Sequence, residues 1–421
     1  MLSIVYKTWA LFFGFAIICL GHGLQGTLVG VRAVIENFSY ISIGIIITGY
    51  YIGFLSGSLI IPHFLKKVGH IRVFAALASL ASIAILLHSI FIDPFAWFFI
   101  RILTGLCLAG ISVIMESWLN DKADKETRGG LLSVYMIITF TFIGIGSLLL
   151  NLSDPAKFDL FVLVSIFLSF ALIPILLTSS NPPSFENPKR LNFADLYKLS
   201  PLGFVGALLI GLAHGTIFGL GAVYAKTNGL DNFQVSLFIV ILTIFGALFQ
   251  WPIGFVSDKI DRRVVLVLVT FIASVICILL IISSYLSITL LYILLALYAG
   301  MSLPMYSLVI AHTNDYLQPD EIVAASAAIV ALVGCGAIFG PITASYFMTI
   351  LGPNGFFIFL FIVHLALGLF GVYRMAIRTK PVDIESQYVP LPRTITQVGM
   401  ELNPKAKIDD DYLGEKSFFE K

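Results

Sequence analysis

The sequence predicts an all-α integral membrane protein with twelve transmembrane helices, arranged as two parallel six-helix pseudo-repeats with both termini in the cytoplasm. Three observations predict this class: an apolar composition, a regular series of long apolar stretches, and an internal repeat at about half the chain length. Of the 421 residues, 58% are hydrophobic and only 12% are charged. Soluble domains carry about 25% charged residues, so an ordinary soluble domain is excluded.

Each crossing of a bilayer requires about 20 consecutive, mostly apolar residues. Twelve stretches meet this requirement, at 8–30, 41–61, 72–92, 95–115, 129–150, 160–178, 201–223, 234–255, 264–283, 288–311, 323–346 and 355–374. The first is longer than the apolar region of a signal peptide, about 7 to 15 residues, so we expect it to remain in the mature protein. The four cysteines lie within these stretches without paired spacing and indicate neither a zinc site nor a disulfide framework.

The basic residues of the connecting segments are unevenly distributed. Thirteen Lys and Arg fall on one side of the predicted membrane and three on the other, and the tail from Arg374 onward adds eight to the first side. Because short cytoplasmic loops carry an excess of Lys and Arg, the basic side is predicted to be cytoplasmic. An even number of crossings then places both termini there.

The two halves of the chain share motifs at nearly the same offset, 192 residues for the first pair below and 194 for the second. LGHG at 20–23 matches LAHG at 212–215, and LND at 119–121 matches TND at 313–315. Six crossings return the chain to its starting side, so the repeat is parallel. Parallel repeats related by an axis along the membrane normal occur in one large class of secondary transporters, which bind substrate between the repeats near the midplane.

A Pro-, Asn- and Ser-rich segment separates the halves, since its prolines would break a helix. The predicted organisation is an N-terminal six-helix bundle at 1–178, a cytoplasmic linker at 179–200, a C-terminal six-helix bundle at 201–376 and a disordered cytoplasmic tail at 377–421. Within the linker, LNFADL could start a short surface helix.

Residues 254–263, GFVSDKIDRR, resemble the loop motif Gly-x-x-x-Asp-Arg-x-Gly-Arg-Arg of the major facilitator superfamily. The positions that match in kind are Gly254, Asp258, Lys259, Arg262 and Arg263. The equivalent N-terminal loop keeps Gly69 and Arg72 but has Lys66 where the aspartate of the motif would be. In the family this aspartate is implied to cap a neighbouring helix and to latch the outward-open state.

Other segments extend this resemblance over residues 1–376. RILTGLCLAG at 101–110 is similar to the family's Arg-x-x-x-Gly element, whose arginine is implied to act in coupling or substrate binding. ESWLNDKADKETRG, QWPIG and SLVIAHTND look like a bacterial branch of poorly characterised permeases, the YcaD-like group. The resemblance therefore implies a multi-pass protein of the bacterial inner membrane. The Gly-Pro motif of antiporters is absent from the fifth stretch. Its absence weakens the hypothesis of drug–proton antiport without excluding it.

Few titratable residues lie within the predicted helices, and an intramembrane charge is by default a candidate functional group. These residues are His22, Arg101, Glu116, His214 and His364. With a rise of about 1.5 Å per residue, His22, Arg101 and His214 fall in one layer slightly to the extracellular side of the midplane. The resemblance implies that the first, fourth and seventh helices line the central cavity.

The chemistry of this layer predicts recognition of an anion. Arginine stays charged and offers a bidentate fork to carboxylate or phosphate, and no Asp or Glu lies at its depth. Histidine titrates near physiological pH, so His22 and His214 are candidate hydrogen-bonding or proton-coupling groups. Gln25 is a further polar candidate. Other groups that could add polar or stacking contacts, none of them favoured by the sequence, are Tyr50, Tyr51, Tyr135, Gln250, Trp251 and Tyr306.

Each assignment has a structural alternative. Arg101 could anchor helix ends or pair with outer acids, and an isolated histidine often only bonds a neighbouring helix. We expect His364 to be structural and Glu116 to bond the basic loops as part of an intracellular gate. The glycines around His22 allow either helix bending or close static packing.

The leading hypothesis is a secondary active transporter that alternates access by rocking its two halves. Within this class, the sequence favours a proton-coupled importer of a small organic anion. Proton-driven efflux of an amphiphilic compound and a non-transporting receptor or scaffold remain alternatives. The metalloprotease, nucleophile-elbow and phosphate-loop motifs are absent from the sequence, so it predicts no enzyme, no cofactor and no metal site. The expected partners are a small-molecule substrate, the proton and lipid, without nucleic acid, and we expect a monomer.

Overall fold

The computed structural model describes residues 8–124, 126–177, 191–283, 286–317, 321–377 and 388–404. Every regular element in these residues is helical, which confirms the all-α class. Most of the predicted linker and parts of the predicted tail lie outside the described residues.

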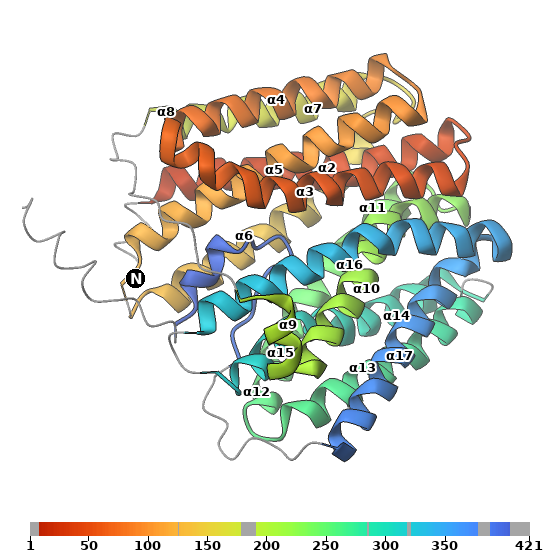
Figure 1. Cartoon of the computed structure of the whole chain (residues 1–421). Coiled ribbons are helices and arrows are strands. Elements are labelled where there is room, and N and C mark those ends of the chain that lie inside the picture. The colour runs from red at the N-terminus through yellow and green to blue at the C-terminus, as the bar shows by residue number, and fades with distance from the viewer. Residues whose placement is uncertain are drawn as a thin grey trace, which may run out of the picture.

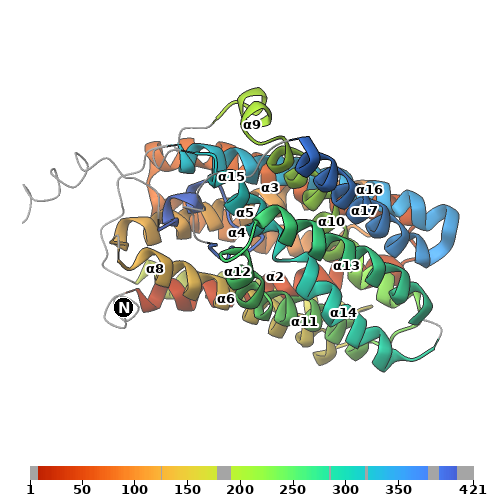
Figure 2. The ribbon, with the colours of Figure 1, turned by 90° about the horizontal axis from the view of Figure 1, so that it is seen from below.

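The described helices fall into two sets along the chain. The first set is α2 (Trp9–Ile35), α3 (Tyr40–Val68), α4 (His70–Ile90), α5 (Pro94–Lys122), α6 (Arg128–Leu148), η1 (Leu149–Leu152), α7 (Asp159–Phe170) and α8 (Leu172–Leu176). The second set is α9 (Phe193–Leu199), α10 (Pro201–Thr227), α11 (Asn232–Leu248), α12 (Gln250–Ser257), α13 (Arg262–Ser283), α14 (Ile288–Ser302), α15 (Met305–Asn314), α16 (Ile322–Leu351), η2 (Gly352–Asn354), α17 (Gly355–Ile377) and η3 (Val398–Leu402). The first set, red to yellow, and the second, green to blue, lie side by side in one bundle (Figure 1). The short α9 lies outside this bundle (Figure 2).

Eleven continuous helical segments of the described chain are long and apolar enough to cross a membrane. The longest, Ile322–Ile377, contains two helices of sufficient length, α16 and α17, which meet at η2. Gly352 makes this reversal possible because its φ of +69° lies in the left-handed region that favours glycine. The twelve crossings that result coincide with the twelve predicted stretches.

Side-chain caps fix several of the points where the chain re-enters the bundle. Asp93 Oδ1 accepts a hydrogen bond of 2.9 Å from the Ala96 amide at the start of α5. At the start of α11, Asp231 and Gln234 exchange hydrogen bonds of 2.8 and 3.0 Å in a capping box. These caps satisfy amide groups that a helix start leaves without an intrahelical partner.

Glycines bring α3 and α5 into backbone contact. A Cβ atom on Gly53 would lie 1.9 Å from the Ile102 carbonyl oxygen, and one on Gly105 would lie 2.0 Å from that of Tyr50. Small residues permit this approach between membrane helices. The close packing places Tyr50 of α3 near the first half of α5, where Arg101 lies.

Direct hydrogen bonds join the two sets of helices away from the basic loops. Thr48 Oγ1 of α3 donates to the Ile338 carbonyl of α16 at 2.9 Å, and Asn151 of η1 donates to Ser236 Oγ of α11 at 3.1 Å. The loops α3–α4 and α12–α13 lie at the other end of the bundle, here called the basic end. The sets are therefore closed on each other at the end opposite the basic one.

The predicted disorder of the tail is wrong for residues 388–404, here called the tail segment. This segment, violet in Figure 1, lies between the two sets of helices, and its η3 packs against α5, α6 and α16. Its apolar side chains Leu391, Ile395, Met400 and Leu402 are at most 2% exposed. Composition suggested disorder because the tail has few apolar runs, prolines at 381, 390 and 392, and an acidic run at 409–411. Side chains of both sets of helices nevertheless hydrogen-bond the backbone of the tail segment.

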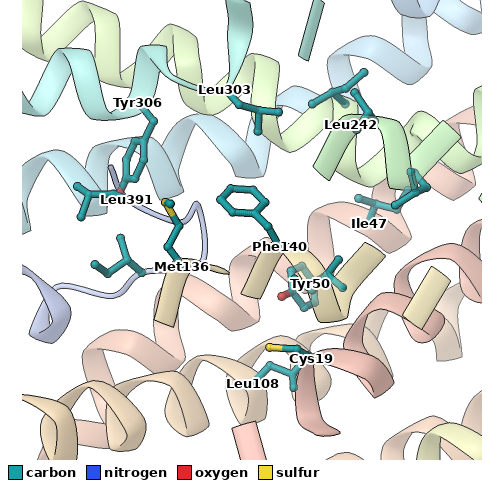
Figure 3. Packing of buried hydrophobic residues seen from close by; sticks show 14 of the residues in the cluster. Cys19, Ile47, Tyr50, Leu108, Met136, Phe140, Leu242, Leu303, Tyr306 and Leu391 are labelled. Atoms are coloured by element: carbon teal, nitrogen blue, oxygen red, sulfur yellow. The ribbon is translucent and has the colours of Figure 1, made fainter. Parts of the chain in front are cut away.

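The tail segment contributes to the common hydrophobic core. In Figure 3, Leu391 lies beside Tyr306 of α15, and Met136 and Phe140 of α6 lie across from them. All four belong to one buried cluster that continues through the bundle to Tyr50. The tail segment is therefore packed as an internal layer of the molecule.

Candidate functional site: a cationic cavity between the helix sets

Arg101 lies within α5 and is only 7% exposed. Its guanidinium carbon lies 4.6 Å from the centre of the Tyr50 ring, which is a cation–π distance. Its Nε has no hydrogen-bond partner among the described residues. A buried, charged group with unused donors is costly unless a ligand or water completes it.

His22 lies on α2 beside the same tyrosine. Its Nε2 is 3.2 Å from the Tyr50 hydroxyl, and the two rings are 5.8 Å apart. Tyr50 thus contacts His22 through its hydroxyl and Arg101 through its ring face. This arrangement brings two of the three predicted layer residues together through a residue of α3.

A cavity of about 50 Å³ opens beside this cluster. It is lined by His22, Gly23, Gly26, Thr27, Val29, Gly30, Ile47, Tyr50, Tyr51, Arg101, Ile143, Phe218, Gly219, Ala222, Ile239 and Arg393. None of these described lining residues is an aspartate or glutamate. The volume has room for roughly one or two water molecules, and the cavity carries two guanidinium groups without a carboxylate.

His214 of α10 lies on a neighbouring cavity of about 60 Å³. Its Nε2 is 3.1 Å from the Ser302 carbonyl oxygen, to which it can donate, and its Nδ1 has no described partner. Tyr50, Tyr51 and Arg393 line both cavities. The structure therefore places His22 and His214 in two cavities that share three lining residues.

Two other polar residues of the helices lie away from these cavities. His364 of α17 bonds the Leu360 carbonyl at 2.7 Å and Ser302 Oγ at 3.2 Å, which fits the expected structural role. Gln25 is fully buried, does not line either cavity, and its amide atoms have no partner among the described residues.

The motif residues of the C-terminal half form an ion-pair network at the basic end. Arg262, only 2% exposed, donates to Asp258 at 2.6 Å and also pairs with Asp315, which follows α15. Gly254 lies under the ring of Tyr388, since a Cβ atom there would approach the ring to 2.3 Å. The motif thus connects α12, α13 and α15 with the tail segment.

The adjacent motif residues make local contacts. Arg263 donates to both carboxylate oxygens of Asp261, with Nη2 at 2.7 Å from Oδ2. Burial alone would raise the pKa of Asp261, but the hydrogen bonds from Arg263 outweigh it and hold that pKa below its usual range. The ammonium group of Lys259 lies 3.9 Å from the centre of the Phe255 ring.

The N-terminal loop lacks an equivalent network in the part of the chain that the structure describes. Lys66 and Arg72 are exposed, and neither makes an ion pair with a described residue. Gly69 ends α3 with a φ of +88°, a conformation that favours glycine. The described part of this loop therefore keeps the glycine turn of the motif but lacks the ion pairs seen around Arg262.

The expectation that Glu116 bonds the basic loops is wrong. Its fully buried carboxylate accepts hydrogen bonds from the Thr396 amide at 3.0 and 3.1 Å, the Gly399 amide at 2.9 Å, the Thr396 hydroxyl and the Tyr135 hydroxyl at 3.1 Å. Amides and a hydroxyl of the tail segment therefore bind this carboxylate, where basic side chains of the loops were expected.

Sequence reasoning did not single out Arg393 of the tail segment. Its guanidinium carbon lies 3.7 Å from the centre of the Phe218 ring, and the residue lines both cavities together with Tyr51. In the sequence Arg393 is one of eight Lys and Arg residues from Arg374 onward, so no local pattern distinguished it. Within the described residues, no group of three His, Cys, Asp or Glu side chains could hold a metal ion.

Twelve crossings in two parallel six-helix repeats, with a buried cationic cavity between them, define a secondary transporter. A family model of the Major Facilitator Superfamily matches residues 11–306 and 203–402, and the chain belongs to this family. Members of this family are transporters rather than enzymes, which agrees with the sequence prediction.

Individual relatives confirm the predicted branch. The uncharacterized MFS-type transporter YcaD of Escherichia fergusonii is 25% identical over 350 residues, which cover 82% of this chain and 90% of the relative. An uncharacterized MFS-type transporter of Yersinia pestis is 27% identical over 380 residues, covering 89% and 96%.

Solved structures share the fold. The nucleoside transporter NupG superposes with a TM-score of 0.73 at 15% identity, covering 88% of this chain and 100% of that one. A bacterial homologue of the human lysosomal transporter Spinster superposes with a TM-score of 0.68 at 13% identity, covering 96% and 99%. At these identities the likeness establishes the fold alone.

Proposed function

We propose that this transporter takes up a small organic anion together with protons across the bacterial inner membrane, with its basic end in the cytoplasm. The observation that carries the proposal is the buried guanidinium group of Arg101, whose Nε has no hydrogen-bond partner among the described residues, on a cavity whose described lining holds no carboxylate. An anionic cargo would supply the missing counter-charge and accept the unused donors.

His22 is the candidate coupling group. It contacts the Tyr50 hydroxyl at 3.2 Å, and Tyr50 also contacts Arg101. Protonation of His22 would add a second positive charge beside the arginine and favour an anion in the same cavity. Loss of the cargo would then favour release of the proton, because two cations would remain close together.

A second candidate function is export of an amphiphilic compound. The cavity beside His214 has a wall of Tyr50, Tyr51, Phe54 and Tyr306, and aromatic rings of this kind suit apolar ligands. This candidate predicts binding that does not depend on Arg101.

A thermal-shift experiment separates the two candidates. The purified protein is tested against carboxylates, phosphate monoesters and lipophilic cations at about pH 5.5 and about pH 7.5, on either side of the usual histidine pKa. A ligand that binds only the folded state raises the melting temperature. We expect a carboxylate or phosphate ester to stabilise the protein, more strongly at the lower pH.

Two variants locate the binding site. Arg101→Ala and His22→Gln should abolish or reduce the anion effect, and Arg72→Ala provides the control because Arg72 is exposed at the basic end. Stabilisation by lipophilic compounds alone, unchanged in Arg101→Ala, would instead favour export. If none of these compounds stabilised the protein, the hypothesis of a non-transporting receptor or scaffold would be favoured.

A further inference from the structure

The tail segment is held along its backbone by side chains of the C-terminal half. The Tyr388 amide donates to Asp258 Oδ1 at 2.8 Å, and the Leu391 amide donates to Ser307 Oγ at 3.0 Å. The Tyr388 hydroxyl reaches Gln250 Oε1. These contacts fix the first part of the segment against α12 and α15.

Side chains of the N-terminal half hold the second part. Glu116 accepts the amides of Thr396 and Gly399, and Asn120 donates to the Val398 carbonyl at 2.9 Å. Recognition of backbone groups at several points, with buried side chains between them, is how proteins bind extended peptides. The groove between the halves therefore has the features of a peptide site.

The tail segment also fills the space that a cargo would need. Arg393 lines both cavities, and with it in place they measure about 50 and about 60 Å³. Sites for small organic molecules usually measure about 300–1,000 Å³. A cargo larger than a few water molecules cannot occupy these cavities while the tail segment is seated.

We propose that the groove between the two halves at the basic end is a peptide-binding site whose occupant is the chain's own tail segment, and that this occupant excludes cargo. Alternating access moves the two halves against each other around a central site. A segment bonded to both halves keeps them apart at the basic end, so it must leave before that end can close. The exclusion of cargo rests on the proposed transport function, whereas occupation of the groove does not.

Gly399 provides a way to displace the tail segment without altering the helices. A Cβ atom at this position would lie 2.8 Å from the Glu116 carboxylate and 2.5 Å from Ile395 Cγ1, so Gly399→Leu cannot fit the groove. Pro404→Ala is the matched control, because Pro404 is an exposed residue of the same segment. Both changes are made in the full-length chain.

Release is measured by thiol labelling of Met400→Cys, a position that is fully buried. The background is Cys335→Ser, since Cys335 is the native cysteine that is partly exposed. A buried thiol reacts with a polar maleimide only when the segment opens. We expect Gly399→Leu to accelerate labelling by at least about tenfold and Pro404→Ala to leave it unchanged.

Equal labelling rates with glycine and leucine at position 399 would overturn the proposal. Thr396→Ala serves as a second variant, because it removes one donor to Glu116 without adding volume, and it should accelerate labelling to a lesser degree. Size-exclusion profiles that match the parent show that the variants are folded.

The exclusion of cargo is tested with lactate, succinate and benzoate in the thermal-shift experiment. If the tail segment competes with cargo, a stabilising anion should act at lower concentration in Gly399→Leu than in Pro404→Ala. Faster labelling without any effect of anions would retain the peptide site and reject anion transport. Anion binding that is equal in both variants, despite faster labelling, would reject the exclusion of cargo.

Discussion

Tyr50 lies between a histidine and an arginine, with Arg101 4.6 Å from the centre of its ring and its hydroxyl 3.2 Å from His22 Nε2. The ring orients the guanidinium group, and the hydroxyl orients the imidazole. The two groups proposed to bind cargo and proton are therefore linked through one side chain of α3. Separate substitutions can test its two contacts.

Tyr50→Phe should change coupling more than binding. The ring face beside Arg101 remains, whereas the hydrogen bond to His22 is lost. We expect the pH profile of anion uptake into proteoliposomes to shift, with a smaller change in affinity at a fixed pH. Tyr346→Phe is the control, because this tyrosine is 56% exposed. An unchanged pH profile would argue against His22 as the coupling group.

Arg101→Lys should separate the effect of charge from that of shape. Lysine keeps a positive charge but lacks the planar fork of arginine. Hydrogen bonds to charged groups contribute about 1.5–3 kcal/mol, so complete loss in Arg101→Ala corresponds to roughly ten- to a hundredfold weaker anion binding. Arg101→Lys should fall between Ala and the parent in a titration, and affinity equal to the parent would show that charge alone suffices.

Asp315→Asn should destabilise the protein measurably. Its partner Arg262 has a side chain only 1% exposed, and Asp315 is 4% exposed. Weakening a hydrogen bond between charged groups in such surroundings costs about 1.5–3 kcal/mol. The Asp195–Lys198 pair spans 3.7 Å with both side chains more than half exposed, so Asp195→Asn should change stability by less than about 0.5 kcal/mol. Thermal unfolding in detergent compares the two, and equal melting temperatures would show that the Arg262 network is not needed for stability.

The Asp261–Arg263 pair should make stability depend on pH. Because the folded pKa of Asp261 is lowered, the pair stabilises the fold above the ordinary aspartate pKa of about 3.9. This stabilisation is lost as the pH falls through the lower, folded value. Asp261→Asn should therefore melt below the parent near neutral pH and approach it in acid, and a constant difference across this range would contradict the assignment.

The helices could be predicted closely because each must satisfy its backbone hydrogen bonds within the bilayer and must cover its thickness. The stretch at 264–283 corresponds to α13 at Arg262–Ser283, and LNFADL begins a helix at Phe193. Apolar length and capping residues alone determine these positions. The packing of the helices was harder to predict from the sequence, since it depends on contacts such as that of Gly53 with the Ile102 backbone.

The site could be predicted only where burial itself was informative. Arg101 and His22 were identifiable because charged or titratable groups are rare within apolar stretches. The partners of Glu116 were not, because they are backbone amides of Thr396 and Gly399, and every residue except proline carries such an amide. Nothing in the local sequence distinguishes a tail that lies in water from one that lies in a polar groove.

Two glycines that follow His22 on α2, Gly23 and Gly26, should respond differently to the same substitution. A Cβ atom on Gly23 would lie 2.1 Å from the Ile143 carbonyl oxygen, whereas one on Gly26 would have nothing within 4 Å. Gly23→Ala must push α2 away from α6, and overpacking of this kind costs about 1–3 kcal/mol. Gly26→Ala should retain the melting temperature of the parent, but it adds a methyl group to the wall of the cavity that holds His22 and Arg101. Gly26→Ala should therefore alter anion affinity at unchanged stability, and a loss of stability equal to that of Gly23→Ala would mean that the space beside Gly26 is needed for packing rather than for a ligand.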